Sequence, residues 1–436
     1  MSPTFSSFGI RNYRLWWTGG FVSNIGTWVG RVGQDWLVLT VLSNGSATAL
    51  GIVTGLQFLP FLLLAPWAGL VADRFPKHRV LLFTQSMLLL NSLVLGLLAV
   101  TGTAQLWHVY AIASFQGVMT ALNNPAQQAF VSEMVPTDRI ANAVALNSAS
   151  FNSGRLVGPA VAGLVIAWWG TGEALLVNTL TFVFVIVALL RIRPDELKPV
   201  PLSRGRGRIR EGIAYVRHRR DLQLVMGLVF VLGTFGMNFQ ITMALMATKV
   251  FDKGASEFGL LGSVMAVGSL TAALLSARRR RPRLRVLLVA LLGFVVATAA
   301  AALAPTYWTF AAALTLVGLA SLTALTTANA MVQTRVAPEM RGRVMALYLA
   351  ILMGGTPAGA PLIGWVSELF GPRWTIGVGT VAVGLAVAAA AVYLTRTENV
   401  RVSFESHGSP HLQVTSTPLR ADRHEDVSVP VPETAR

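Results

Sequence analysis

The sequence predicts an all-α polytopic membrane protein whose twelve transmembrane helices form two six-helix pseudo-symmetric bundles. Hydrophobic residues make up 53% and charged residues only 12% of the 436 positions, whereas soluble domains carry about 25% charged residues. The chain also contains twelve apolar runs of roughly the length that crosses a bilayer as a helix. Finally, its second half repeats its first half.

The repeat is clearest in the glycine-rich stretch from Phe151 to Gly170. Its glycines at 154, 158, 163 and 170 recur at 355, 359, 364 and 371, each displaced by 201 residues. Two parallel copies in an apolar chain are typical of secondary transporters, whose substrate site lies between the copies near the middle of the membrane. We therefore expect a transporter with a central site.

The apolar runs define the expected domains. A cytoplasmic N-terminus (1–13) precedes an N-terminal six-helix bundle (14–191), and a cytoplasmic linker (192–221) joins this bundle to a C-terminal six-helix bundle (222–395). The spacing of Ile209, Ile213 and Val216 predicts an amphipathic linker helix on the inner leaflet. The polar residues 396–436 are expected to form a disordered cytoplasmic tail. The runs are 14–42, 48–71, 79–101, 107–130, 140–168, 174–191, 222–248, 257–277, 285–304, 307–332, 343–367 and 374–395.

The net charge of +16 would suggest nucleic-acid binding in a soluble domain, but the positions of the basic residues indicate membrane topology. If the N-terminus is cytoplasmic, 25 Lys and Arg residues lie in inner loops and three lie outside. The positive-inside rule then predicts a multi-pass protein of the cell membrane with both termini cytoplasmic. We expect the lipid bilayer and a small-molecule substrate as partners, and no nucleic acid.

Sequence signatures of enzymes and of ATP-driven pumps are missing. The chain has no cysteine, no Gly-x-x-x-x-Gly-Lys-Ser/Thr loop and no His-Glu-x-x-His motif. We therefore expect no enzymatic activity, no bound metal, no nucleotide and no cofactor, which leaves an ion gradient as the energy source.

Asp35 is the one acidic residue that lies well inside an apolar run. Arg31 precedes it by one helical turn, so the two side chains share a face and are able to pair. A charged side chain at this depth is costly unless it is paired or hydrated, and it usually faces a cavity. Two interpretations stay open: Asp35 carries a coupling proton with the help of Arg31, or the two residues form a structural pair that closes the bundle.

Polar side chains in three further runs are candidates for a substrate cavity. The alternative is that they form hydrogen bonds between neighbouring helices, as polar residues in membrane bundles often do. The candidates are Gln116, Asn123, Asn238, Gln240 and Asn329.

Small residues at close spacing mark the fifth and eleventh runs. Such residues let helices approach closely, and Pro159 removes a backbone hydrogen bond and bends its helix. These positions are Gly154, Gly158, Pro159 and Gly163, with Gly355, Gly359 and Gly364 in the second half.

The segment between the second and third runs reads Gly69-Leu-Val-Ala-Asp73-Arg74-Phe-Pro-Lys77-His-Arg79. It resembles the signature loop between helices 2 and 3 of the major facilitator superfamily, although Pro76 stands where that loop usually has glycine. The resemblance implies that Gly69, Asp73, Arg74 and Arg79 form a latch that stabilises the outward-facing conformation. The alternative is an ordinary basic cytoplasmic loop.

Other motifs resemble the exporter branch of the superfamily that includes the bacterial enterobactin exporter. The Gly154–Gly163 stretch is similar to the helix-5 motif of drug and metabolite antiporters, which is thought to seal the two halves against leak. Arg155 in this stretch has no acidic partner in its own run. The fold implied by the resemblance brings its helix near Asp35, so we expect Arg155 to pair with Asp35, the alternative being that it attracts an anionic group of the substrate.

The resemblance implies a monomeric exporter of a small amphipathic molecule, either a drug or a siderophore-like metabolite, that works by alternating access with proton antiport. One departure concerns the superfamily's second motif, in which the proton-relay arginine is replaced by Ala113. Two alternatives remain: a nutrient importer or facilitator with the same fold, and a membrane scaffold or sensor that does not transport.

Overall fold

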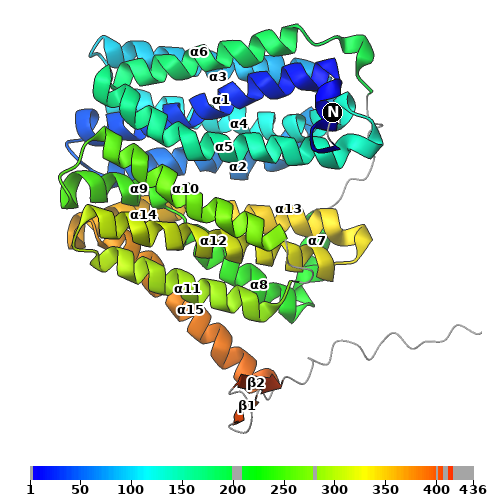
Figure 1. Ribbon diagram of the computed structural model, residues 1–436, viewed down its shortest axis with the longest axis vertical. Coiled ribbons are helices and arrows are strands. Elements are labelled where there is room, and N and C mark those ends of the chain that lie inside the picture. The colour runs from blue at the N-terminus through cyan, green and yellow to red at the C-terminus, as the bar shows by residue number, and fades with distance from the viewer. Residues whose placement is uncertain (1–2, 199–208, 278–281, 399–400, 406–410, 416–436) are drawn as a thin grey trace, which may run out of the picture. The chain divides into compact units, whose positions relative to one another are not determined.

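The computed structural model describes residues 3–198, 209–277, 282–398, 401–405 and 411–415 (Figure 1). Met1–Gly384 form one compact unit and Leu385–Arg436 a second. The N-terminal half contains α1 (Arg11–Trp36), α2 (Ala47–Arg74), α3 (Lys77–Val100), α4 (Leu106–Met134), α5 (Ile140–Trp168) and α6 (Thr171–Leu190). The C-terminal half contains α8 (Arg220–Val231), α9 (Phe239–Leu245), α10 (Ala255–Ala277), α11 (Leu284–Leu303), α12 (Tyr307–Arg335), α13 (Pro338–Gly354), α14 (Thr356–Phe370) and α15 (Trp374–Glu398).

The twelve predicted spans correspond to twelve helical segments. Nine segments among the described residues are long and apolar enough to cross a membrane by length and composition. The other three are α1, α4 and α5, which are similarly long at 26, 29 and 29 residues but are more polar. The all-α polytopic fold class is therefore confirmed, with helix ends that differ from the expected ones by a few residues.

Two spans that the sequence predicted as single helices are interrupted. In the seventh span, α8 passes through a π-helical turn (Leu232–Gly236), and the backbone leaves helical geometry at Met237 and Asn238 before α9 begins. In the eleventh span, α13 ends at Gly354 and α14 begins at Thr356. Both interruptions contain glycines, which destabilise a helix interior, and Pro357 in the second lacks a backbone N–H donor.

The sequence repeat appears as a repeat of helix packing. In the N-terminal half, α4 packs against α2 and α3, and in the C-terminal half α12 packs against α10 and α11. In Figure 1 the helices α1–α6 lie together above the helices of the C-terminal half. The first compact unit therefore contains two bundles of matching arrangement.

The two halves meet along two helix pairs, α2 with α14 and α5 with α10. Glycines bring the backbones together at both contacts. A Cβ atom at Gly163 would lie 2.6 Å from the carbonyl oxygen of Ala255, and a Cβ at Gly364 would collide with the backbone of Ala47. Larger residues at these positions would force the two halves apart.

The remaining motif glycines pack within their own half. Gly154 and Gly158 face Asn24 and Trp28 of α1. Their counterparts Gly355 and Gly359 both face Thr234 in the seventh span. Positions that are 201 residues apart thus make equivalent contacts in the two bundles. The first two glycines of each motif pack against the cavity-facing helix of their own half, and the third packs against the opposite half.

A polar clamp joins the halves at one end of the bundle. The carboxylate of Glu368 accepts hydrogen bonds from Ser46 Oγ at 2.6 Å, from Thr48 Oγ1 at 2.8 Å and from the backbone N–H of Thr48 at 3.1 Å. Ser46 is also the N-cap of α2. A negative charge is favourable at a helix N-terminus, so Glu368 fastens α14 to the start of α2. We call this the closed end.

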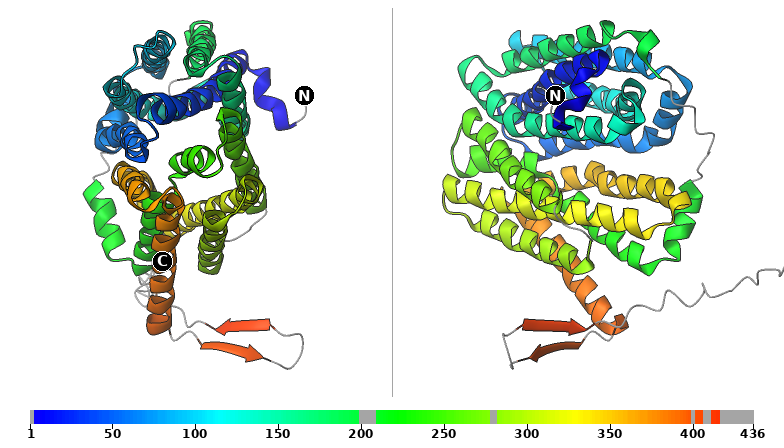
Figure 2. Two further views of the ribbon diagram at one scale, coloured as in Figure 1. Left: turned by 90° about the vertical axis from the view of Figure 1, so that its left-hand side faces the viewer. Right: turned by 45° about the vertical axis from the view of Figure 1, so that its right-hand side comes forward.

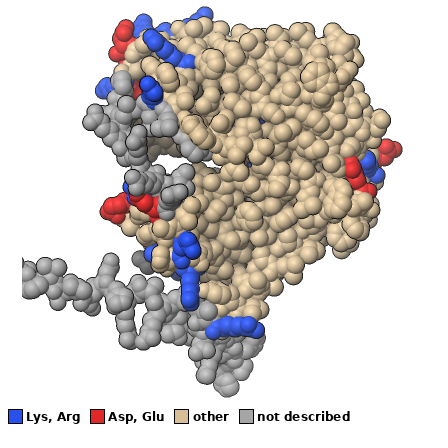
Figure 3. All heavy atoms as spheres, turned by 180° about the vertical axis from the view of Figure 1, so that it is seen from behind, with Lys and Arg blue, Asp and Glu red and all other residues tan. Residues whose placement is uncertain are grey.

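The opposite end of the bundle, where α1 begins, is the open end. No ion pair among the described residues crosses from one half to the other. At the open end Lys77 pairs with Glu133 at 3.0 Å within the N-terminal half, and Arg335 pairs with Asp221 at 3.5 Å within the C-terminal half. Figure 3 shows a gap in the molecular surface between the halves at this end.

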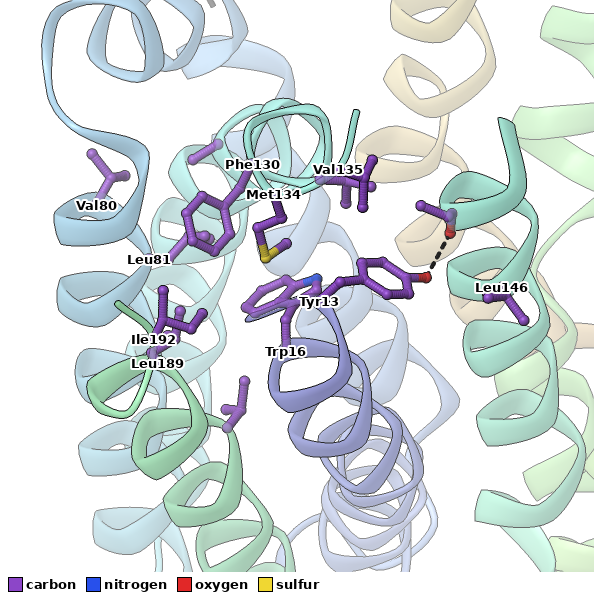
Figure 4. Close-up of a cluster of buried hydrophobic side chains, with 14 of the residues drawn as sticks. Tyr13, Trp16, Val80, Leu81, Phe130, Met134, Val135, Leu146, Leu189 and Ile192 are labelled. Atoms are coloured by element: carbon purple, nitrogen blue, oxygen red, sulfur yellow. Dashed lines mark hydrogen bonds between the residues drawn. The ribbon is translucent and has the colours of Figure 1, made fainter. Parts of the chain in front are cut away.

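A buried apolar cluster ties the helices of the N-terminal half together at the open end (Figure 4). Trp16 of α1 meets Phe130 of α4 edge to face, with ring centroids 5.5 Å apart. The hydroxyl of Tyr13 donates a hydrogen bond of 2.9 Å to the carbonyl oxygen of Ala143 at the start of α5. The helices of the N-terminal half are therefore packed together at the end where the two halves separate.

The linker contains the helix that its spacing predicted, α7 (Ile209–Arg217). Gly212 of α7 lies against the backbone of Arg343 in α13, and Arg343 forms an ion pair with Glu211. The basic stretch 204–208 lies outside the described residues. Within the described linker, α7 is thus attached to the C-terminal half.

Most of the tail predicted to be disordered, 396–436, lies outside the described residues. The last span, α15, continues to Glu398, and two antiparallel strands follow, β1 (Arg401–Glu405) and β2 (His411–Thr415), which Figure 2 shows as a hairpin. Val402 pairs with Val414 and Phe404 with Leu412. Such alternation of apolar and polar residues favours a strand pair.

The first prediction concerns the clamp at the closed end. Replacing Glu368 with Ala removes three hydrogen bonds to an exposed charged acceptor, and water compensates for part of their loss. We expect the population that is open at this end to rise about tenfold. Because the chain has no cysteine, spin labels on Thr40→Cys and Lys253→Cys will report the distance across the closed end by double electron–electron resonance.

The control is Glu339→Ala, which removes an exposed glutamate from the start of α13. It should leave the distance distribution unchanged. An unchanged distribution in Glu368→Ala would mean that the glycine contacts alone hold the closed end.

Candidate functional site

A cavity of about 560 Å³ lies between the two halves. Residues of α1–α6 line it on one side, and residues of the interrupted seventh span, α10, α12 and the α13–α14 junction line it on the other. It reaches toward the open end as far as Trp16 and Gln127. Its volume falls within the range of about 300–1,000 Å³ that is usual for small-molecule sites.

The wall formed by the N-terminal half carries the positive charge and most of the polar groups of the cavity, beside aromatic rings such as those of Trp28 and Phe58. Gln57 Nε2 donates to Gln116 Oε1 at 3.4 Å across α2 and α4. Asn123 Oδ1 accepts a hydrogen bond from Thr84 at 2.9 Å, and its amide donates to Gln127 at 3.0 Å. The polar residues that line this wall are Ser23, Asn24, Thr27, Arg31, Thr54, Gln57, Gln85, Gln116, Thr120, Asn123, Asn124, Gln127 and Arg155.

The wall formed by the C-terminal half is mainly apolar and contains several methionines. Asn238, Gln240 and Thr356 are its polar members. Methionine is flexible and polarisable, so it fits ligands of irregular shape. The apolar residues of this wall include Met237, Phe239, Ile241, Met243, Phe258, Met265, Leu325, Leu352 and Met353.

The two arginines of the cavity have no carboxylate partner among the described residues. Arg31 and Arg155 both line the cavity, and neither takes part in an ion pair. The guanidinium of Arg31 lies 5.3 Å from the ring centroid of Trp28, a cation–π contact, while its Nε is buried without a hydrogen-bond partner. Trp28 also packs against Gly158, one turn beyond Arg155 on α5.

Asp35 lies one turn beyond Arg31 on α1, toward the closed end. It is only 4% exposed, and its Oδ2 has no hydrogen-bond partner. The expected pairs of Asp35 with Arg31 and with Arg155 are not formed, since no ion pair in the described chain includes Asp35. The next residue, Trp36, stacks on Phe258 of α10 at 5.7 Å between ring centroids. Asp35 is therefore buried beside a contact between the halves.

The structure brings together most of the side chains that the sequence suggested for a cavity. Gln116, Asn123, Asn238 and Gln240 all line it. Asn329 is not among the described residues that line it. Its Oδ1 accepts a hydrogen bond of 2.6 Å from Gln333, one turn along α12.

Sequence reasoning missed several lining residues. Ser23, Asn24 and Thr27 precede Arg31 at helical spacing, so the face of α1 that carries the arginine was readable from the sequence. Gln57 and Gln85 are isolated polar residues in apolar runs, which marks them as candidates. Nothing in the sequence alone indicated that the methionines of the second half face the same space.

The predicted latch lies at the open end, where α2 ends at Arg74 and α3 begins at Lys77. Arg74 and Arg79 are exposed, and neither has an ion-pair partner among the described residues. The side chain of Asp73 lies outside the described part of the molecule. A Cβ atom added at Gly69 would meet no other atom within 4 Å beyond the backbone of its own helix, so this conformation leaves room for a side chain there.

Comparison with known proteins agrees with this architecture. The sequence profile of the family described as transmembrane secretion effector matches residues 2–424. The chain is 26% identical over 404 residues to a staphyloferrin A transporter of Staphylococcus aureus, covering 91% of this chain and 99% of that protein. It is 24% identical over 360 residues to an enterobactin exporter of Citrobacter koseri, covering 81% and 82% of the two chains. A macrolide efflux protein of Streptococcus pyogenes is 22% identical over 354 residues, covering 79% and 87%.

Solved structures show the same fold at low sequence identity. A bacterial homologue of the human lysosomal transporter Spinster, in an inward-facing and unoccupied conformation, matches with a TM-score of 0.67 at 16% identity over 91% of this chain and 96% of that one. A D-xylose–proton symporter matches with a TM-score of 0.67 at 12% identity, over 87% and 96% of the two chains. With two matching bundles, a cavity between them and a family profile that spans nearly the whole sequence, the chain belongs to the transmembrane secretion effector family of major facilitator superfamily membrane transporters and is not an enzyme.

Proposed function

We propose that this transporter exports a small amphipathic molecule by alternating access, driven by proton antiport. The observation that carries the proposal is the cavity of about 560 Å³ whose walls come from both halves, enclosed at one end by Glu368 and the glycine contacts. Rocking of the halves about these contacts would open the cavity to the other side, as secondary transporters of this build do. The substrate class, a drug or siderophore-like metabolite, is supported by the relatives named above.

The proposed orientation places the open end in the cytoplasm. The short loops at that end carry most of the basic residues, among them Arg74, Lys77 and Arg79 after α2. The positive-inside rule assigns such loops to the cytoplasmic side. The conformation is then inward-facing, and a substrate would enter from the cytoplasm.

Asp35 is the proposed proton carrier. It is a carboxyl group 4% exposed, one helical turn from Arg31 and adjacent to the Trp36–Phe258 contact between the halves. A buried carboxylate without partners is disfavoured relative to its protonated form. Protonation of Asp35 would therefore favour the present inward-facing arrangement. Loss of the proton would favour an arrangement in which Asp35 pairs with Arg31 or Arg155.

The alternatives are less well supported. An importer or facilitator could use the same cavity, but two of the relatives named above are called an exporter and an efflux protein. A scaffold that does not transport would not need unpaired Arg31, Arg155 and Asp35 inside a membrane bundle, where such groups are costly. An exporter uses all three.

The second prediction tests proton coupling in proteoliposomes. Asp35→Asn keeps the shape of the side chain but cannot release a proton, so substrate transport against a gradient should be lost while the helical content is kept. A pH gradient is imposed, and substrate flux and proton flux are recorded together for a panel of dyes and siderophores. Asp138→Asn, at a side chain 76% exposed, should transport as the wild type does.

Gradient-driven efflux retained by Asp35→Asn would overturn the assignment of Asp35. Substrate movement that ignores the pH gradient in the wild type would favour facilitated diffusion or a different coupling ion.

The third prediction tests orientation. In intact cells a membrane-impermeant maleimide should label Lys253→Cys, in the closed-end loop after α9, and should spare Thr137→Cys, in the open-end turn before α5, until the membrane is permeabilised. Both residues are exposed. The reverse labelling pattern would invert the topology and with it the direction of transport.

A further inference from the structure

The cavity holds two positive charges and no negative one among the residues that line it. Arg31 and Arg155 are its charged members, and neither has an ion-pair partner in the described chain. The Nε of Arg31 is buried and makes no hydrogen bond. Elsewhere in the described chain Lys77, Arg219 and Arg335, for example, pair with carboxylates. Arg31 and Arg155 differ from these three residues in having no carboxylate partner among the described residues.

An arginine inside a membrane protein is costly unless an anion or water compensates its charge. Asp35 is the nearest acidic residue along α1, but it does not line the cavity and forms no ion pair. Guanidinium groups bind carboxylates and phosphates through paired N–H donors. An acid group on a ligand could therefore balance the charges of Arg31 and Arg155.

The two arginines lie on one wall of the cavity, on the helices α1 and α5, which pack against each other. Trp28 contacts the guanidinium of Arg31 through its ring, and its Cβ lies against Gly158, one turn from Arg155. Its ring also meets Phe151 at 6.4 Å between centroids. Both positive charges therefore lie on the side of the cavity that the N-terminal half forms.

The facing wall suits an apolar body. Four methionines line it, Met237, Met243, Met265 and Met353, and Phe258 closes it near the stacked Trp36. A ligand that bridges the cavity would place a charged group on the N-terminal half and an apolar group on the C-terminal half.

We propose that the cavity binds an amphipathic organic anion, with its carboxylate or equivalent acid group between Arg31 and Arg155 and its apolar part against the methionine wall. The proposal rests on the transport function proposed above and narrows its substrate to one charge class. Bound substrate then supplies the counter-charge that Asp35 does not provide in this conformation.

The fourth prediction is tested by equilibrium binding without any ion gradient. The protein in phosphatidylcholine nanodiscs is titrated with dansylglycine, an aromatic carboxylate, and with dansylglycinamide, which has the same apolar body and no charge. Dansyl fluorescence reports entry into an apolar site, and empty nanodiscs are subtracted. We expect the carboxylate to bind about tenfold or more tightly, as charge-assisted hydrogen bonds require.

Variants show which residues cause the preference for the carboxylate probe over the amide probe. Arg31→Gln and Arg155→Gln should each reduce the ratio of the two affinities several-fold, while Arg31→Lys should keep part of it because the positive charge remains. Met243→Ala and Met265→Ala should weaken both probes to a similar extent. Arg220→Gln removes an exposed arginine outside the cavity and should change neither affinity. Size-exclusion profiles and circular dichroism verify that each variant is folded.

Equal affinities for the two probes, tighter binding of the amide, or no binding of the carboxylate at its solubility limit would overturn the proposal. So would a preference that survives in both Arg→Gln variants. These outcomes are independent of proton coupling, since no gradient is present. A strong preference for the carboxylate in a protein that moves no protons would support the anion site and refute the antiport mechanism.

Discussion

Close contact between the two halves through glycines is the constraint on which the rest of this structure depends. Added Cβ atoms at Gly51, Gly163 or Gly364 would meet the backbone of the opposite half, so α2–α14 and α5–α10 approach more closely than larger side chains permit. Because these contacts are shared along two helix pairs and fastened by Glu368 at one end, the halves diverge at the other end. The space between them becomes a cavity that both halves line.

The two walls of the cavity carry different side chains, although the two halves share one arrangement of helices. The N-terminal half contributes both arginines, most of the amides and hydroxyls and several aromatic rings, whereas the C-terminal half contributes the four methionines. The two halves therefore share one arrangement of helices, while different side chains at equivalent positions give the cavity a charged side and a side rich in methionine. Asp35 lies outside this lining but beside the Trp36–Phe258 contact between the halves.

Much of the fold was readable from the sequence because lipid leaves little choice: a spanning segment must satisfy its own backbone hydrogen bonds and does so as a helix. The repeat and the face of α1 with Arg31 were equally visible. The break at Met237 was not, because it depends on packing of Thr234 against Gly355 and Gly359. Asn329 looked like a cavity residue but bonds to Gln333, and the facing of the methionines is set by tertiary packing that periodicity does not encode.

The polarity of α1, α4 and α5 has a consequence for how this protein is made. These are the spanning helices that fall short of the hydropathy of the other nine, and each contributes polar or charged side chains to the cavity. Insertion of a helix into the membrane is driven by its own apolarity, and arginine or aspartate near its centre opposes that step. The N-terminal bundle must therefore gain part of its insertion energy from neighbouring helices such as α2, α3 and α6, so the side chains that line the cavity also make assembly of this half cooperative.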